Sequence, residues 1–209
     1  RDGRKWLWRD DEALAPGAGK LGHVDDTIAV VEPCHWHIDV QPSQADFRTR
    51  HTAAGHTVEV RRQIDLSGST LRSTSRLTNR GDAPMELEWF AHPFFALDDA
   101  DLIQVTLPEA ASIPPDCGFE LEEGILRGSR RYIGKDDGAF TMLAGFESDP
   151  VTATVSHPRL ENGIRFSTDF VPSECPIWVN GFTFSIEPYQ TLQLAPGESR
   201  EWTLAYVFG

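Results

Sequence analysis

The sequence predicts an all-β fold, an antiparallel β-sandwich, and three observations lead to this prediction. Apolar and polar residues alternate with a period of two in several segments, as in strands with one buried face. Turns rich in Gly, Pro and Asn separate these segments by about 10 to 15 residues. Only residues 10–14 suggest a turn or two of helix. Sandwiches of 209 residues can fold as one unit, so residues 1–209 are predicted to form a single domain.

The first strands are predicted in the middle of the chain. In residues 58–66, Val, Ile and Leu at even positions alternate with charged or amide side chains at odd positions. Ser67-Gly68-Ser69 makes a turn, and residues 71–77 continue the alternation as a second strand. After a further turn at residues 79–82, residues 85–89 place Met, Leu and Trp on the core face of a third strand.

The same pattern returns towards the C-terminus. Residues 164–170 alternate after the turn signal Asn162-Gly163. A second run covers residues 182–186, with Phe, Phe and Ile on the predicted core face. The closing strand, residues 202–208, has a large aromatic face. Between the two groups of strands, residues 108–118 predict a long irregular connection that forms a rim or a lid.

Composition excludes several classes of partner. Lys and Arg total 19 against 32 Asp and Glu, a net charge of -13, so nucleic acid is repelled by the average field. The longest apolar stretches, residues 27–31 and 89–97, are far shorter than the roughly 20 residues that span a bilayer, so no membrane segment is predicted. Three distant cysteines, Cys34, Cys117 and Cys175, give no disulfide framework, and we expect a cytoplasmic protein.

His92 is the first candidate for chemistry. The alternation of the strand before it places His92 off the core face, and Pro93 forces it into an extended backbone that ends regular pairing. Imidazole is the side chain that titrates nearest neutral pH, so a histidine leaving a strand among aromatic residues suits proton transfer. The alternative is a structural histidine that is hydrogen-bonded at a strand end.

Glu187 is the second candidate, and its setting repeats that of His92. It lies on the predicted polar face of a strand and is followed at once by Pro188. The alternative is a solvated surface carboxylate, which is the commoner fate of glutamate.

Together these two segments resemble the galactose mutarotase and aldose 1-epimerase family. Members of that family carry a catalytic His in a His-Pro-x-Phe strand end and a catalytic Glu in a Glu-Pro segment, which here match His92 and Glu187. The likeness also includes residues 77–84, which end a strand before the His segment, and residues 194–198 before the closing strand. It covers roughly residues 58–209 and implies a sandwich of the supersandwich type, shortened at its N-terminal end.

The resemblance implies a reaction without metal or cofactor. Glu187 would take the proton from the anomeric hydroxyl, and His92 would protonate the ring oxygen. The sugar ring then opens and closes again as the other anomer. We expect the imidazole and the carboxylate to lie about 5 to 8 Å apart, by analogy with paired carboxylates around a glycosidic centre.

A sugar also needs aromatic surfaces for its apolar faces, and the family supplies a second histidine upstream. His23, His35 and His37 are in range of that second position, and His35 is favoured. The predicted sugar-binding residues are His35, His37, Trp36, Phe94, Trp178 and Asp169.

Two histidines with one residue between them on a strand share a face, so His35 and His37 could also chelate a metal ion. A cupin-like site would require a Glu about four residues later, where Gln41 stands instead. No metal or cofactor is therefore predicted.

The sequence thus predicts an aldose 1-epimerase-like isomerase that interconverts the anomers of a small-molecule sugar. One alternative is a non-catalytic carbohydrate-binding β-sandwich module that uses the same cleft. Another is a plain structural β-domain. Neither the identity of the sugar nor the oligomeric state follows from the sequence.

Overall fold

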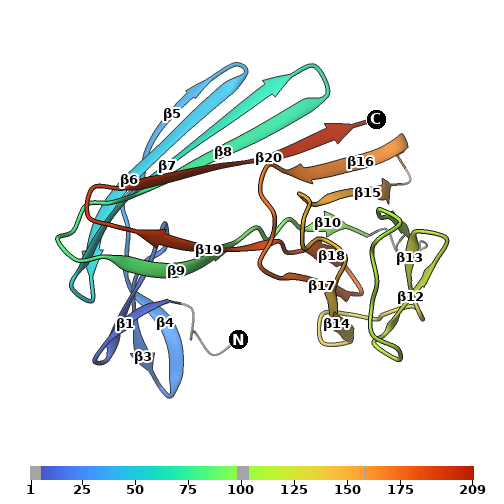
Figure 1. The fold of residues 1–209 in the computed structure, drawn as a ribbon, viewed down its shortest axis with the longest axis horizontal. Coiled ribbons are helices and arrows are strands. Elements are labelled where there is room, and N and C mark those ends of the chain that lie inside the picture. The colour runs from blue at the N-terminus through green and yellow to red at the C-terminus, as the bar shows by residue number, and fades with distance from the viewer. Residues whose placement is uncertain (1–5, 98–103, 158) are drawn as a thin grey trace. The chain divides into compact units, whose positions relative to one another are not determined.

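The computed structural model describes residues 6–97, 104–157 and 159–209. These residues form strands and connections without a helix, so no helix in the described part of the chain could span a bilayer. Every strand pair with a described register is antiparallel. The prediction of an all-β antiparallel fold is confirmed. The chain divides into two compact units. Figure 1 shows the strands as a ribbon coloured by residue number.

The first unit contains the described residues up to Ser67, together with Arg72–Trp89 and Thr191–Thr203. A four-stranded sheet of order β1-β2-β3-β4 opens it, and a second sheet runs β5-β6-β7-β8-β20. Its strands are β1 (Leu7–Arg9), β2 (Glu12–Ala15), β3 (Gly19–Val24), β4 (Thr27–Pro33), β5 (His37–Gln41), β6 (Gln44–Ala53), β7 (His56–Ser67), and most of β8 (Thr70–Asn79) and β9 (Met85–Phe90).

The second unit contains Gly68–Leu71, Phe90–Gln190 and Leu204–Gly209. One sheet has the order β10-β18-β17-β14, and another runs β12-β13-β11-β15-β16-β20. Strands β19 (Tyr189–Leu194) and β20 (Ser199–Phe208) contribute to both units. The remaining strands are β10 (Phe95–Ala96), β11 (Gln104–Thr106), β12 (Phe119–Glu122), β13 (Ile125–Gly128), β14 (Gly138–Leu143), β15 (Thr152–His157), β16 (Leu160–Thr168), β17 (Cys175–Asn180) and β18 (Thr183–Ile186).

The strands predicted from alternation correspond to β7, β8, β9, β16, β18 and β20. The helical turn predicted at residues 10–14 is wrong. Asp10 and Asp11 form the turn of the β1–β2 hairpin, and β2 begins at Glu12. Asp10 adopts a φ of 54°, a left-handed conformation that Asp tolerates in turns because its short polar side chain can bond locally.

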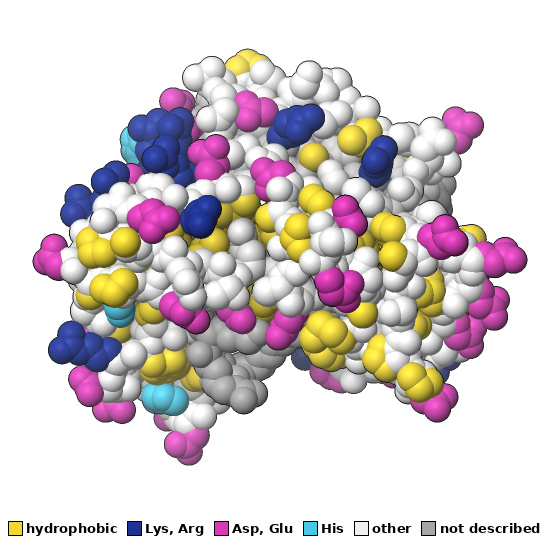
Figure 2. All heavy atoms as spheres, viewed as in Figure 1, with side chains coloured by type: hydrophobic (Ala, Val, Ile, Leu, Met, Phe, Trp, Pro, Cys, Tyr) yellow, Lys and Arg dark blue, Asp and Glu magenta, His cyan; other side chains and the backbone are white. Residues whose placement is uncertain are grey.

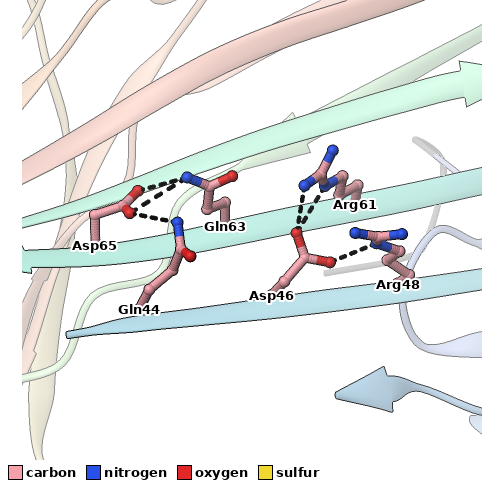
Figure 3. Close-up of polar contacts among 6 residues, drawn as sticks. All are labelled: Gln44, Asp46, Arg48, Arg61, Gln63 and Asp65. Atoms are coloured by element: carbon pink, nitrogen blue, oxygen red, sulfur yellow. Dashed lines mark hydrogen bonds and ion pairs between the residues drawn. The ribbon is translucent and has the colours of Figure 1, made fainter. Parts of the chain in front are cut away.

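The outer face of β6 and β7 is held by cross-strand polar pairs (Figure 3). The Asp46 carboxylate contacts the guanidinium groups of Arg48 at 2.5 Å and Arg61 at 2.7 Å. Burial works against the charged form of Asp46, but hydrogen bonds from the two guanidiniums outweigh it and lower the pKa of the carboxyl. Lys and Arg side chains gather over this part of the first unit, whereas acidic side chains are spread over both units (Figure 2).

Asn79 connects two turns of the first unit. Its side chain, which is fully buried, donates from Nδ2 to the carbonyls of Ala83 at 2.8 Å and Leu194 at 3.0 Å. Its Oδ1 accepts the amide of Gly81, and its backbone carbonyl accepts the amide of Gly197. The two segments recognised in the sequence, residues 77–84 and 194–198, therefore meet at one asparagine.

The sheet β10-β18-β17-β14 supplies much of the core of the second unit. Ile177, Val179, Phe184 and Ile186 are fully buried on its inner face. Phe166, from β16, is also fully buried and meets Phe95 edge-on. This packing fixes the sheet whose other face carries the candidate site.

The long connection predicted at residues 108–118 lies against the free edge of β14. Ser112 exchanges two backbone hydrogen bonds with Ala144, just after β14, each of 3.0 Å. Gly118 lies so close to Ala139 that a Cβ atom on the glycine would be 2.5 Å from that of Ala139. The connection therefore covers a sheet edge, and it also lines a cavity of about 740 Å³ together with Leu107, Leu121, Glu123 and Gly124.

Candidate functional site

His92 and Glu187 come from the ends of two strands that leave their sheets side by side. β9 ends at Phe90 and β18 ends at Ile186. The amide of Ala91 then donates to the carbonyl of Pro188 at 3.3 Å. Each functional side chain is followed by a proline, which supplies no amide for further pairing. The two extended exits are thus adjacent.

The imidazole and the carboxylate are in direct contact. His92 Nδ1 lies 3.3 Å from Glu187 Oε1. The same nitrogen lies 3.1 Å from Ser185 Oγ. The expected separation of about 5 to 8 Å, taken from paired carboxylates, is therefore wrong. It assumed that a sugar ring sits between the two groups, whereas the two side chains here are in direct contact.

Burial divides the two groups into an exposed and an enclosed member. The side chain of His92 is 39% exposed, and that of Glu187 only 7%. A carboxylate so far from solvent requires partners, and Glu187 has one in the imidazole. Its backbone amide also donates to the carbonyl of Pro176 at 2.8 Å, which fixes the start of the Glu-Pro segment. The exposed imidazole is consequently the member that a ligand reaches first.

Aromatic rings surround the imidazole. Phe94 stacks on His92 with ring centroids 4.3 Å apart, and Trp178 meets it edge-on at 6.1 Å. Phe90, on the other side, stacks on Tyr189 at 4.5 Å. Phe94 is 64% exposed, so it offers a free apolar surface next to the acid–base pair. Two of the predicted sugar-binding aromatics, Phe94 and Trp178, therefore lie at the site.

Two residues of this site were missed by sequence reasoning. Ser185 lies opposite Trp178 in the β17–β18 register and is fully buried beneath the imidazole. Cys175 is 2% exposed, and burial, followed by the charge of Glu187, raises the pKa of its thiol to about 12. Ser185 shares the strand parity of Glu187, a signal that could have identified it. The pattern gave no signal for Cys175.

The remaining four predicted sugar-binding residues lie in different units of the chain. Asp169 follows β16 in the second unit and is exposed. His35, Trp36 and His37 belong to the first unit, with both histidines exposed. Trp36 donates from Nε1 to the carbonyl of Gly17 at 3.1 Å. Sugar binding by these four residues stays a prediction.

The described residues contain no group of three His, Cys, Asp or Glu side chains arranged to hold a metal ion. A second cavity, of about 790 Å³, lies in the first unit between β2, β3 and the turn at Gly55. Neither this cavity nor the one beside the 108–118 connection is lined by His92 or Glu187.

Comparison with solved structures identifies the architecture. A galactose mutarotase related enzyme from Lactobacillus acidophilus matches with a TM-score of 0.62 and 13% sequence identity, over 96% of this chain and 78% of that one. The chain has the galactose mutarotase-like fold. A galactose mutarotase-like protein from Lactobacillus casei gives a TM-score of 0.60 at 15% identity, over 95% of this chain and 80% of that one.

A third match is a protein from Escherichia coli K12 proposed to be an aldose 1-epimerase. Its TM-score is 0.61 at 15% identity, over 96% of this chain and 79% of that one. No family model matches the chain, and no curated protein matches it in sequence. The resemblance to the galactose mutarotase-like proteins, first seen in two short motifs, is thus confirmed at the level of the fold.

Proposed function

We propose that this protein is an aldose 1-epimerase-like isomerase that interconverts the α and β anomers of a free sugar. The observation that carries the proposal is the contact between His92 and Glu187 beside an exposed aromatic ring. A carboxylate and an imidazole in contact supply a proton acceptor and a proton donor without a metal ion. The fold supports the proposal because proteins of this architecture include ones named for the same activity.

The close contact fits the chemistry of the anomeric centre. The hydroxyl to be deprotonated and the ring oxygen to be protonated are both bonded to the same carbon, so their catalysts can be neighbours. Nδ1 of His92 faces Glu187, which leaves Nε2 for the sugar. Glu187 would accept the proton of the anomeric hydroxyl, and His92 would donate to the ring oxygen. Ring opening, rotation of the aldehyde and closure give the other anomer.

Sugar orientation in this proposal depends on the surrounding rings. An apolar face of the pyranose would stack on Phe94 or Trp178, while its hydroxyls meet polar groups such as Asp169. His35, Trp36 and His37 are proposed as further ligands on the strength of the family resemblance. The partner is a small-molecule sugar, and the proposed location is the cytoplasm.

The proposal is tested by polarimetry on freshly dissolved α-glucose, α-galactose, a panel of other aldoses and their phosphates. The protein should accelerate the drift in optical rotation, and Glu187→Gln should abolish the gain. Glu161→Gln, which changes an exposed glutamate on β16, is the matched control and should keep full activity. Saturable quenching of tryptophan fluorescence by a sugar without any rate effect would instead establish a carbohydrate-binding module. Failure of both assays with all sugars would refute both functions.

A further inference from the structure

Within the described part of the chain, no strand pairs with the outer edge of β5 in the first unit. β5 ends the sheet order, and its register pairs all five of its residues with β6, from His37 opposite Arg48 to Gln41 opposite Gln44. All five residues are exposed. An edge strand presents a row of backbone N–H and C=O groups without strand partners, which is a template for another strand.

The other terminal strands of the described sheets with four or more strands show the usual protections. The edge of β14 is covered by the connection in which Ser112 pairs with Ala144. β4 has an irregular register with β3 and ends at Pro33. β12 carries the charges of Glu120 and Glu122, while β1 and β10 have only three and two residues. Short edges, charges, bulges and covering loops are the devices by which native proteins avoid edge pairing.

β5 has fewer of these devices, and Asp39 is its only carboxylate. Its register with β6 is unbroken, and it contains neither proline nor lysine. One face carries Ile38 and Val40, which are 53% and 71% exposed. The other face carries His37, Asp39 and Gln41. The strand is therefore regular and amphipathic, with two large aliphatic side chains in water.

We propose that β5 pairs with β5 of a second copy of this chain, in an antiparallel arrangement about a two-fold axis at Ile38. In this register the Ile38 side chains of the two copies are opposite each other. His37 of each copy is opposite Asp39 of the other, and Trp36 is opposite Val40. Apolar side chains then meet on one face and complementary polar ones on the other, which is the self-complementarity that a two-fold interface requires.

Charge favours this register over the one with the two-fold axis at Asp39. Within its own sheet Asp39 is opposite Asp46, a like charge, and the Asp46 carboxylate is already held by Arg48 and Arg61 (Figure 3). His37 of the second copy would give Asp39 a hydrogen-bond donor. With the two-fold axis at Asp39, two carboxylates would face each other, which destabilises a cross-strand pair. A shift to an odd offset would place aliphatic side chains opposite polar ones.

This inference does not depend on the chemistry proposed for His92 and Glu187, because β5 lies in the first unit and that pair in the second. It does use Trp36 and His37, which are also proposed as sugar ligands. It gives the His35-x-His37 segment a role at a protein interface. Only about five residues from each copy take part, so the interface is small and the dimer is weak and concentration-dependent.

Sedimentation velocity from low to several hundred micromolar protein tests the proposal. The wild type should shift with concentration from the 23.3 kDa of one chain towards twice that mass. Val40→Lys should lose the heavier species, because lysine on an edge strand opposes pairing. Ile133→Lys, which changes a 76% exposed aliphatic side chain of the second unit, is the matched control and should dimerise like the wild type. Thermal unfolding checks that each variant is folded.

A charge swap tests the register itself. His37→Asp should weaken the dimer, since two Asp side chains then face each other across the interface. Adding Asp39→His to His37→Asp exchanges the two residues, restores a His opposite each Asp in the proposed register and should recover the dimer. A wild type that stays monomeric throughout, or a Val40→Lys protein that dimerises normally, overturns the proposal. A double variant no better than His37→Asp overturns the two-fold axis at Ile38.

Discussion

Ser185→Ala removes one of the two oxygen atoms that lie against His92 Nδ1. The Ser185 hydroxyl is 3.1 Å from that nitrogen and fully buried. A hydrogen bond of this kind contributes a net of about 0.5 to 1.5 kcal/mol. If this energy positions the imidazole in the transition state, kcat/KM for mutarotation falls by about 2- to 13-fold, with the loss in kcat rather than KM. Ser173→Ala, at an exposed serine of the same unit, should leave both constants unchanged.

Glu187→Gln keeps the shape of the side chain and removes its charge. Loss of a proton acceptor of this type lowers the rate by about 10²- to 10⁴-fold. Because Ser185 and Glu187 contact the same nitrogen, the two changes should not be independent. We expect the double variant to lose less than the product of the two single losses. Initial rates of change in optical rotation for the wild type, the two single variants and the double variant, all at one pH, give the double-mutant cycle.

Two results would refute this reasoning. If the losses in the double variant multiply, Ser185 does not act through the nitrogen that Glu187 contacts. If Ser185→Ala lowers the midpoint of thermal unfolding but leaves kcat/KM untouched, the hydroxyl is structural only. In that case His92 would be oriented by Glu187 and the stacked Phe94 ring.

Asn79→Ala leaves the buried carbonyl of Leu194 without its donor and should destabilise the protein by about 1 to 3 kcal/mol. The free energy of unfolding in urea measures this loss. Asn79→Asp should be destabilised as well, because a carboxylate cannot donate a hydrogen bond. Asp137 is held by Arg130 at 2.5 Å and by the amide of Ile133 at 2.8 Å, and these bonds lower the pKa of its carboxyl to about 2. A carboxyl whose pKa is depressed on folding stabilises the native state above its unfolded value near 4 and loses that effect as pH falls towards 2. The protection factor of the Ile133 amide, the exchange rate of an unstructured peptide relative to its own at the same pH, should therefore fall over this interval. Asp137→Asn should show the low protection factor already at pH 5.

Alternation predicted the strands well because each has one face against a core. It could not tell whether the opposite face is covered as well. Ser185 and Glu187 were placed on the polar side of their strand, and both are in fact buried. Phe182 was placed on the core side, yet it is 59% exposed. It precedes β18, which begins one residue later, and its backbone amide donates a hydrogen bond to Asn180 Oδ1 in the turn.

The proline after each of the two candidate residues predicted that both side chains leave their strands. The distance between them depends on the hydrogen bond from Ala91 to Pro188, which joins segments far apart in the sequence and has no local signature. Cys175 reaches the site through pairing of β17 with β18, which is equally non-local. Residues 10–14 were misread because a short polar run fits a hairpin turn as well as a helix, and the antiparallel partner decides between them.

The hydrogen-bond network around Asn79 matters for how related chains are classified by function. The segments at 77–84 and 194–198, which carried part of the sequence resemblance, are hydrogen-bonded to each other through Asn79 and contain neither His92 nor Glu187. A related chain with an inert side chain in place of His92 would still need this hydrogen-bond network to form its turns. Under the proposed function, a family gathered on those segments alone would hold active isomerases together with chains that lack the acid–base pair, and the side chains at 92 and 187 would separate the two.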